Sequence, residues 1–112
     1  MRADDLVRVQ HTIDAAQSAV GFVDGRIRSD LQTDQMLQFA LVRAIEIVGE
    51  AASKVSAQTR AMDERIPWQA IVGTRNRLVH AYFDVDLDVL WAAVAIEIPA
   101  LLVQLRELVG KH

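Results

Sequence analysis

Residues 33–55 read TDQMLQFALVRAIEIVGEAASKV, and their apolar positions recur with the period of an α-helix. One stripe runs through the whole stretch at steps of three and four; it contains Leu37, Leu41, Ala44, Val48, Ala51 and Val55. Met36, Ala40 and Ile47 form part of a second stripe beside it. A helix that is apolar over so wide an arc must contact more than one neighbour, which predicts the central helix of a bundle. We place it near residues 33–57, with Thr33 as N-cap and Asp34 in the first turn.

Three further helices are predicted around this one, near residues 3–23, 67–81 and 86–109. Pro67 suits the first position of the third helix, where its missing N–H does no harm. Asp86 suits the N-cap of the last helix, Pro99 should kink that helix near its middle, and Gly110 should close it. Short polar connections and the lack of strand patterns then predict an all-α, antiparallel bundle of four to five helices, forming one domain over residues 1–112.

The composition restricts the environment and the partners of the chain. Cysteine is absent, which excludes disulfides and thiol chemistry and is compatible with a reducing cytoplasm. The polar, acidic start lacks an apolar signal region, and the longest apolar run, Val89 to Ile96, is too short for a membrane span of ~20 residues. We therefore expect a soluble, cytoplasmic protein. Because the formal net charge is −3, any contact with phosphates must come from a local cluster of cations.

The candidate functional stretch is 73–83, GTRNRLVHAYF, which concentrates polar chemistry in a short run. Arg75 and His80 are five residues apart and would lie ~140° apart around one helix. They can serve one substrate if the helix lies along a groove, or if two copies of the chain meet and bring both pairs into one cleft. Asn76 would share a face with His80. Histidine can move protons and arginine can clamp a phosphate, a combination that suits RNA cleavage without a metal or other cofactor.

A structural interpretation of the same stretch remains open. Arg75 or Arg77 could simply pair with one of the acidic residues that follow, Asp84, Asp86 and Asp88. A metal site at His80 and Asp84 is disfavoured, because two ligands are too few. Gly73 costs ~1 kcal/mol relative to alanine within a helix, so we hypothesise that a neighbouring backbone or a ligand approaches it closely.

A second polar group interrupts the apolar face of the central helix. Arg43, Glu46 and Glu50 are spaced by three and four residues, so they share one face. They could form a supporting polar cluster beside an active site or a partner. The spacing alone favours the simpler interpretation, a surface salt bridge of small energetic value.

Four segments, in order along nearly the whole chain, resemble HepT-like toxins of the HEPN superfamily. The run Arg75-x4-His80-x-Tyr82 is similar to the Arg-x4-His-x-Tyr motif of these toxins. The segment 43–51, RAIEIVGEA, resembles their second helix. Ile66-Pro67-Trp68 followed by Gly73 resembles the lead-in to the motif, and 99–101, PAL, resembles their last helix. The Arg-x4-His pair alone is a weak signal, whereas the ordered set is a strong one.

The resemblance implies a homodimeric helical bundle with ribonuclease activity, the toxin of a type VII toxin–antitoxin pair. By this resemblance Arg75 and His80 are the catalytic residues, while Asn76 and Arg77 bind or orient the RNA. Tyr82 corresponds to the tyrosine that receives AMP from a cognate MntA-type nucleotidyltransferase antitoxin. An added phosphate beside the site would repel RNA.

Two other functions are compatible with the sequence. One is a non-catalytic helical adaptor, or a nucleotide-binding partner of a nucleotidyltransferase. The other is a plain dimerisation bundle, which leaves the motif unexplained. Intact Arg75 and His80 favour the ribonuclease, and RNA cleavage by the purified protein separates it from both alternatives.

Overall fold

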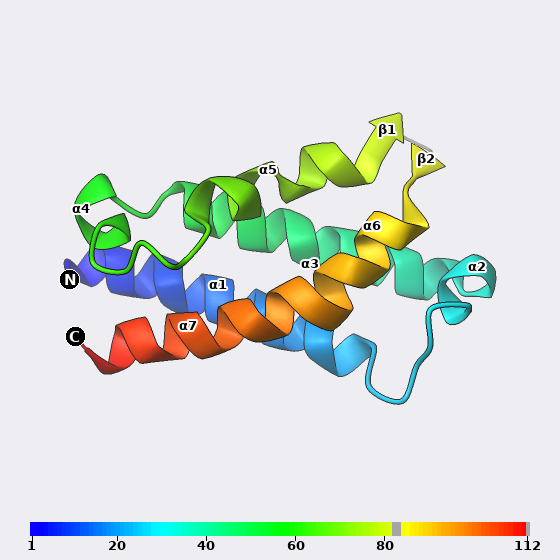
Figure 1. Cartoon of the computed structure of the whole chain (residues 1–112), viewed down its shortest axis with the longest axis horizontal. Coiled ribbons are helices and arrows are strands. Elements are labelled where there is room, and N and C mark those ends of the chain that lie inside the picture. Colours follow the sequence, from blue (N-terminus) through cyan, green and yellow to red (C-terminus); the bar gives the residue numbers. More distant parts are fainter. Residues whose placement is uncertain (82–83, 112) are drawn as a thin grey trace.

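In the computed structural model, long helices run along the molecule in alternating directions (Figure 1). The structure describes the backbone of residues 1–81 and 84–111, and the side chains of these residues apart from those at positions 75 and 79–81. They are α1 (Ala3–Phe22), α3 (Gln35–Ser53), α5 (Trp68–Leu78) and a continuous run of α6 (Leu87–Ala92), the π-helical segment η1 (Ala93–Glu97) and α7 (Ile98–Gly110). The short helices α2 (Asp30–Thr33) and α4 (Ala57–Arg60) lie in the connections. Two short strands, β1 (Val79–Ala81) and β2 (Asp84–Val85), pair in antiparallel fashion.

The helices form the predicted all-α bundle, with α3 at its centre. The helix α3 packs against α1 on one side and α5 on another, while α7 packs against α1. Both chain ends lie at one end of the bundle, and the β1–β2 pair projects at the other end, close to α2 (Figure 1). The wide apolar arc of residues 33–55 therefore has the several neighbours that its width indicated.

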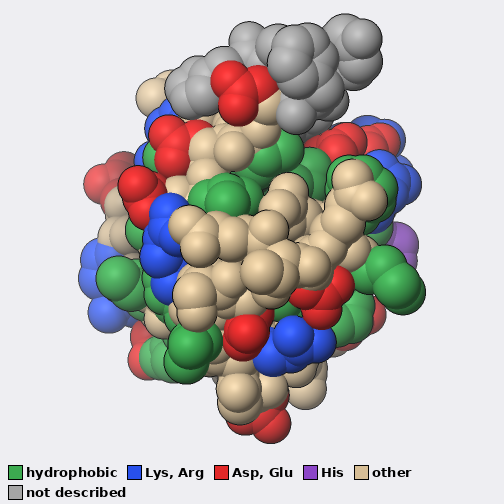
Figure 2. Space-filling model, turned by 90° about the vertical axis from the view of Figure 1, so that its right-hand side faces the viewer, with side chains coloured by type: hydrophobic (Ala, Val, Ile, Leu, Met, Phe, Trp, Pro, Cys, Tyr) green, Lys and Arg blue, Asp and Glu red, His purple; other side chains and the backbone are tan. Residues whose placement is uncertain are grey.

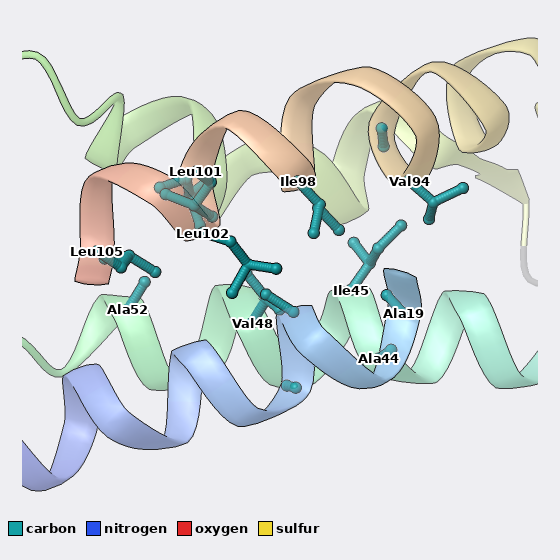
Figure 3. Close-up of a cluster of buried hydrophobic side chains, with 14 of the residues drawn as sticks. Ala19, Ala44, Ile45, Val48, Ala52, Val94, Ile98, Leu101, Leu102 and Leu105 are labelled. Atoms are coloured by element: carbon teal, nitrogen blue, oxygen red, sulfur yellow. The ribbon is translucent and has the colours of Figure 1, made fainter. Parts of the chain in front are cut away.

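The core fills the space between α1, α3 and the C-terminal run. Figure 3 shows apolar side chains of the C-terminal run pointing toward small and branched residues of α3 and α1; the labelled set comprises Val94, Ile98, Leu101, Leu102, Leu105, Ala44, Ile45, Val48, Ala52 and Ala19. Burial of each leucine or isoleucine contributes roughly 1.5–3 kcal/mol of hydrophobic free energy. This packing holds α3 as a rigid support for α5.

The start of the central helix differs by one residue from the prediction. Asp34, and not Thr33, is the N-cap of α3, because its carboxylate accepts the backbone N–H of Leu37 at 3.0 Å. Thr33 is instead the last residue of α2. Asp34 adds a second contact, an ion pair with Arg26 at 3.2 Å, which a threonine could not make.

The end of α3 also comes earlier than predicted, at Ser53 in place of residue 57. The guanidinium of Arg60 donates to the carbonyl oxygens of Ala52, Ser53 and Val55 at 3.0–3.2 Å. The carbonyl of Ala52 also accepts the N–H of Val55 at 3.1 Å, so Arg60 adds donors at a helix end, where intrahelical donors run out. The side chain of Arg60 therefore terminates the helix and leaves residues 57–60 to form α4.

The C-terminal run contains a π-helical segment just before Pro99, and the predicted kink at Pro99 stays a prediction. Asp86 caps α6, as predicted, by accepting the N–H groups of Asp88 and Val89 at 3.1 Å. Pro99 cannot donate a backbone hydrogen bond, and the five residues of η1 directly before α7 adopt π-helical bonding. The last helix ends at Gly110, also as predicted.

The C-terminal run is longer than the apolar run identified in the sequence. It spans 24 residues, Leu87–Gly110, and is long and apolar enough to cross a membrane by those two criteria alone. Its inward side chains, however, belong to the core of the bundle, among them Leu90, Leu105 and Leu108. This burial identifies the run as a core helix of a globular bundle.

Two buried carboxylates tie the connections to the long helices. Asp5 of α1 accepts the backbone N–H of Ser56 at 3.0 Å and the hydroxyl of Thr59 at 2.6 Å, which fixes α4. Hydrogen bonds from these two residues lower the pKa of Asp5 to about 2. Asp63 accepts from the guanidinium of Arg65 at 2.8 Å, and this contact lowers the pKa of Asp63 to about 2.

These two carboxylates predict a loss of stability in acid. Each has a pKa in the folded protein that lies below the ordinary value of 3.8, so its stabilising effect is complete above pH ~4 and is lost as the pH falls toward 2. Melting temperatures followed by circular dichroism should fall over this window. Asp5→Asn should melt lower at pH 7 and show a shallower fall in acid. Equal pH slopes for the two proteins would contradict this assignment to Asp5.

Candidate functional site

The helix that carries the first half of the motif, α5, is seated directly on the backbone of α3. A Cβ atom at Gly49 of α3 would lie 3.4 Å from the carbonyl oxygen of Ile71 and 3.5 Å from that of Val72. The glycine therefore allows the two helices to approach closely, and the buried side chains of Trp68, Ile71 and Leu78 hold α5 in place. The position of the motif helix is thus set by a contact that has no side chain between the two backbones.

Within the described part of the chain no neighbouring backbone approaches Gly73, so that half of the hypothesis is wrong, while the approach of a ligand stays a prediction. No heavy atom outside its own helix neighbourhood lies within 4 Å of a Cβ built at Gly73. The close helix contact occurs at Gly49 instead, on the facing helix. Gly73 leaves an open position on the surface of α5.

The prediction of a single helix over residues 67–81 is wrong at its C-terminal end. The helix stops at Leu78, and His80 lies in β1. The strand pairs Val79 with Val85 and Ala81 with Asp84, with an irregularity between Val79 and Ala81 that falls at His80. Backbone bonds to β2, together with the bond from the N–H of Asp86 to the carbonyl of Leu78 at 2.8 Å, replace those of a further helical turn.

This change of conformation alters the geometry of the motif. Arg75 and Asn76 are in the last turn of α5, whereas His80 follows the end of the helix. The angle of ~140° between Arg75 and His80, and the shared face of Asn76 and His80, applied to a continuous helix and no longer hold. The chain direction turns between them, so a helix end and a strand edge both contribute to one end of the bundle (Figure 1). Tyr82 lies outside the described residues.

The second arginine of the motif has a defined partner. Arg77 pairs with Glu97 of η1 at 3.3 Å and donates to the hydroxyl of Thr74 at 3.1 Å. The ion pair of Arg77 is therefore with Glu97 and not with the aspartates that follow it in the sequence, and Asp88 pairs with Arg28. The alternative pairing of Arg75 lies outside the described side chains. The contacts of Arg77 attach the C-terminal half of α5 to η1. Asn76 is exposed beside it.

The polar group on α3 consists of surface ion pairs, as its spacing favoured. Arg43 lies 3.9 Å from Glu46, and Glu50 lies 3.9 Å from Lys54. Glu46 and Glu50 also line an open groove of about 330 Å³, together with Gly49, Ser53 and Val72, where α3 meets α5. Glu46 and Glu50 therefore border the motif helix near Val72.

The end of the bundle that carries β1 and β2 has mixed charge. Figure 2 views this end, and acidic and basic side chains are interspersed there without a large area of one sign. Asp84 is exposed in β2, next in the chain to the segment that contains Tyr82.

The comparison with known protein families settles the relationship. The profile of the family described as Ribonuclease HepT-like matches residues 12–108, which include all of α3, α5 and the motif. The chain belongs to this family. The resemblance stated from the sequence is thereby confirmed, and so is the assignment to a family of ribonucleases.

Individual relatives agree with the family. A protein of Caldanaerobacter subterraneus with a provisional RNase name is 32% identical over 104 residues, which cover 93% of each chain. A provisionally named ribonuclease HepT of Thermococcus cleftensis is 42% identical over 72 residues, or 64% of this chain and 66% of the relative. A protein of Methanocaldococcus jannaschii, again with a provisional RNase name, is 31% identical over 78% of this chain and 80% of its own. No solved structure matches the chain.

Sequence reasoning missed two residues that position the HepT-like motif. Glu97 holds Arg77 from a segment twenty residues away, and nothing in the local pattern marks it. Gly49 seats α5 on α3, and a glycine within a strongly helical stretch is a signal that could have identified this close contact.

Proposed function

We propose that this protein is an RNA endonuclease that acts as the toxin of a type VII, HepT/MntA-like toxin–antitoxin system. The main support is the placement of Arg75 and His80 on either side of the junction between α5 and β1, in a chain of the HepT-like ribonuclease family. A helix seated on a rigid support and a short strand pair can hold two such groups at a fixed separation.

The proposed reaction uses the 2′-hydroxyl of the RNA as an internal nucleophile. A bond forms between the 2′-oxygen and phosphorus while the bond from phosphorus to the 5′-oxygen breaks. His80 accepts the proton of the 2′-hydroxyl or donates a proton to the leaving 5′-oxygen, and Arg75 stabilises the charge that builds on the phosphate oxygens. Asn76 and Arg77 bind the RNA or orient these groups.

Cleavage by the purified protein in the presence of a chelator tests this proposal. Because neither the nucleophile nor the proton transfers need a cation, EDTA should leave the rate of RNA cleavage nearly unchanged. The measurement follows a labelled RNA on a denaturing gel, with Mg²⁺ added back in parallel. Activity that disappears with EDTA and returns with Mg²⁺ would contradict the mechanism. Absence of cleavage under all conditions would favour the adaptor role.

The proposed enzyme is a twofold homodimer in which the two motifs face a shared cleft. Apolar side chains remain uncovered on α3, where Met36 is 82% and Phe39 is 64% exposed. Val72 of α5 is exposed on the neighbouring helix, and Gly73 beside it leaves room for a second backbone. We name this surface the α3–α5 face; Met36, Phe39, Val72 and Gly73 define it. A second copy would bury this face and place two copies of α5 together.

A charge on this face should dissociate the dimer. Phe39→Glu would place two carboxylates in a symmetric apolar interface, where each unpaired ion costs several kcal/mol. Light scattering at micromolar concentration should then give the mass of one chain, against twice that mass for the wild type. Ile96→Glu is the control, since Ile96 is 69% exposed on η1, outside this face. A monomeric wild type, or equal effects of both substitutions, would contradict the assignment.

The control of this enzyme is proposed to act through Tyr82. This residue follows β1 directly in the chain, two positions beyond His80. An MntA-like nucleotidyltransferase would transfer AMP from ATP to its hydroxyl, forming a phosphodiester bond to the phenolic oxygen and releasing pyrophosphate. The bulk and negative charge of AMP would then oppose the approach of RNA phosphates to the motif.

A further inference from the structure

A groove with a surplus of cations lies between the N-terminal half of α1 and the C-terminal half of α3. It has a volume of about 330 Å³, and its lining includes the charged or titratable side chains of Arg8, His11, Arg43, Glu50 and Lys54. Ile47 and Ala51 complete its floor. The groove is separate from the junction between α5 and β1 that carries the catalytic pair.

The positive charge in this groove is only loosely neutralised. Lys54 lies 3.9 Å from Glu50, and Arg43 lies 3.9 Å from Glu46, both at partly exposed positions where such pairs are weak. Arg8 is half-buried, and in the described part of the chain its guanidinium has no carboxylate or carbonyl partner. A partly desolvated guanidinium gains most from an anion that can accept two hydrogen bonds.

Other cations of the bundle are engaged in tighter contacts. Arg26, Arg65 and Arg77 make ion pairs of 2.8–3.3 Å with Asp34, Asp63 and Glu97. The guanidinium of Arg60 is occupied by three carbonyl oxygens. In a chain of net charge −3, the groove beside Arg8 is therefore a place where positive charge remains available to a ligand.

We propose that this groove binds the phosphate backbone of the RNA substrate outside the point of cleavage. The inference rests on the proposed ribonuclease function and extends it to a second contact surface. Arg43 of α3 and Lys54, which directly follows α3, are eleven residues apart, which corresponds to ~16 Å at the helical rise and is enough for more than one phosphate. Glu50 lines both this groove and the one that borders Val72 of α5, so the two grooves adjoin on the way to the motif helix.

The groove explains how an acidic protein can hold a polyanion. Net repulsion is screened beyond ~8–10 Å at physiological ionic strength, so nearby cations dominate the contact. Arginine and lysine contacts to phosphates release counterions and make the binding depend on salt. Such contacts strengthen binding without selecting a sequence, and the groove therefore contributes affinity while the motif carries out the reaction.

Binding of a fluorescent single-stranded RNA to the full-length His80→Ala protein tests the proposal without cleavage. Arg8→Glu and Lys54→Glu should each weaken binding by at least about tenfold and reduce the slope of log K against log salt by ~0.7 per lost phosphate contact. Arg106→Glu is the matched control; Arg106 is exposed on α7, lacks a partner in the described part of the chain, and does not line the groove. It changes the net charge equally and should weaken binding less than about twofold.

The same substitutions in the active protein separate this inference from the proposed function. Arg8→Glu should raise KM for RNA and leave kcat nearly unchanged, with melting close to that of the wild type. If cleavage persists and Arg8→Glu, Lys54→Glu and Arg106→Glu weaken RNA binding equally, the groove proposal fails while the ribonuclease stands. If Arg8→Glu converts a dimer to a monomer, the groove is a protein interface and the proposal is overturned. Circular dichroism of each variant, with Arg8→Ala as a milder substitution, establishes that the fold is retained.

Discussion

Arg75→Ala and His80→Ala should each lower the rate of RNA cleavage by at least ~100-fold, equivalent to about 2.7 kcal/mol of transition-state stabilisation. Loss of a positioned proton-transfer group lowers the reaction rate roughly 10²–10⁴-fold, and loss of a hydrogen-bond donor that stabilises developing charge lowers it roughly 10²–10³-fold. Single-turnover cleavage of a labelled RNA measures both effects. If His80 and Arg75 act in the same step, the cleavage rate of the double variant should fall by much less than the product of the two single fold-reductions.

The fold should survive both substitutions. Trp68, Ile71, Thr74 and Leu78 are buried side chains of α5 that hold it on the bundle, and alanine at position 75 or 80 leaves these four in place. Melting temperatures should therefore stay within a few degrees of the wild type. Arg106→Ala serves as the control for removal of an arginine and should cleave normally. Cleavage that persists in His80→Ala would place the catalytic centre elsewhere.

Tyr82→Phe should make the enzyme resistant to silencing by its nucleotidyltransferase partner. The substitution removes only the hydroxyl that would accept AMP, so we expect the protein to stay folded and to keep at least part of its activity. In the wild type modified with AMP on Tyr82, the phosphate of AMP would repel an RNA phosphate ~4 Å away by roughly 1 kcal/mol in water and by about 4 kcal/mol in a less polar cleft. The bulk of the adenosine adds to this penalty.

Intact-mass measurement after incubation with the nucleotidyltransferase and ATP checks this expectation. Wild-type protein should gain the mass of AMP and lose cleavage activity together, whereas Tyr82→Phe should do neither. The protein contains one tyrosine, so another modified residue would be chemically distinct and could be located by peptide mapping. Equal gain of mass and equal silencing in Tyr82→Phe would show that control acts at another residue.

Local patterns were enough to predict the bundle and most of its helix ends. Asp86 caps α6 where its side-chain chemistry places it, and α7 ends at Gly110, because helix ends depend on neighbouring backbone groups. Asp34, and not Thr33, caps α3, and its carboxylate also pairs with Arg26. Spacing along one helix cannot reveal this contact with Arg26. The error of one residue therefore reflects tertiary contact and not a wrong helical pattern.

The region around the motif was harder to predict because its structure depends on distant partners. The helical pattern continues past Leu78, but pairing with Val85 and the capped start of α6 favour a strand there. Three aspartates lie near Arg77 in the sequence, yet its partner is Glu97. Two glycines lie within helices that pack together, and the sequence does not show which one faces its neighbour.

The π-helical segment η1 separates two parts of the molecule that must face different ways. Upstream of it, α6 continues from β2 and makes the contact between Asp88 and Arg28; downstream, α7 packs against α1. Wider winding over five residues shifts the phase of side chains on one side relative to the other. Because a π-helical turn holds one residue more than an α-helical turn, deletion of one residue within η1 should restore ordinary α winding and leave the orientations of α6 and α7 nearly unchanged. The π-helical turn therefore lets one continuous helical run make two separate sets of contacts, those of α6 with Arg28 and those of α7 with α1.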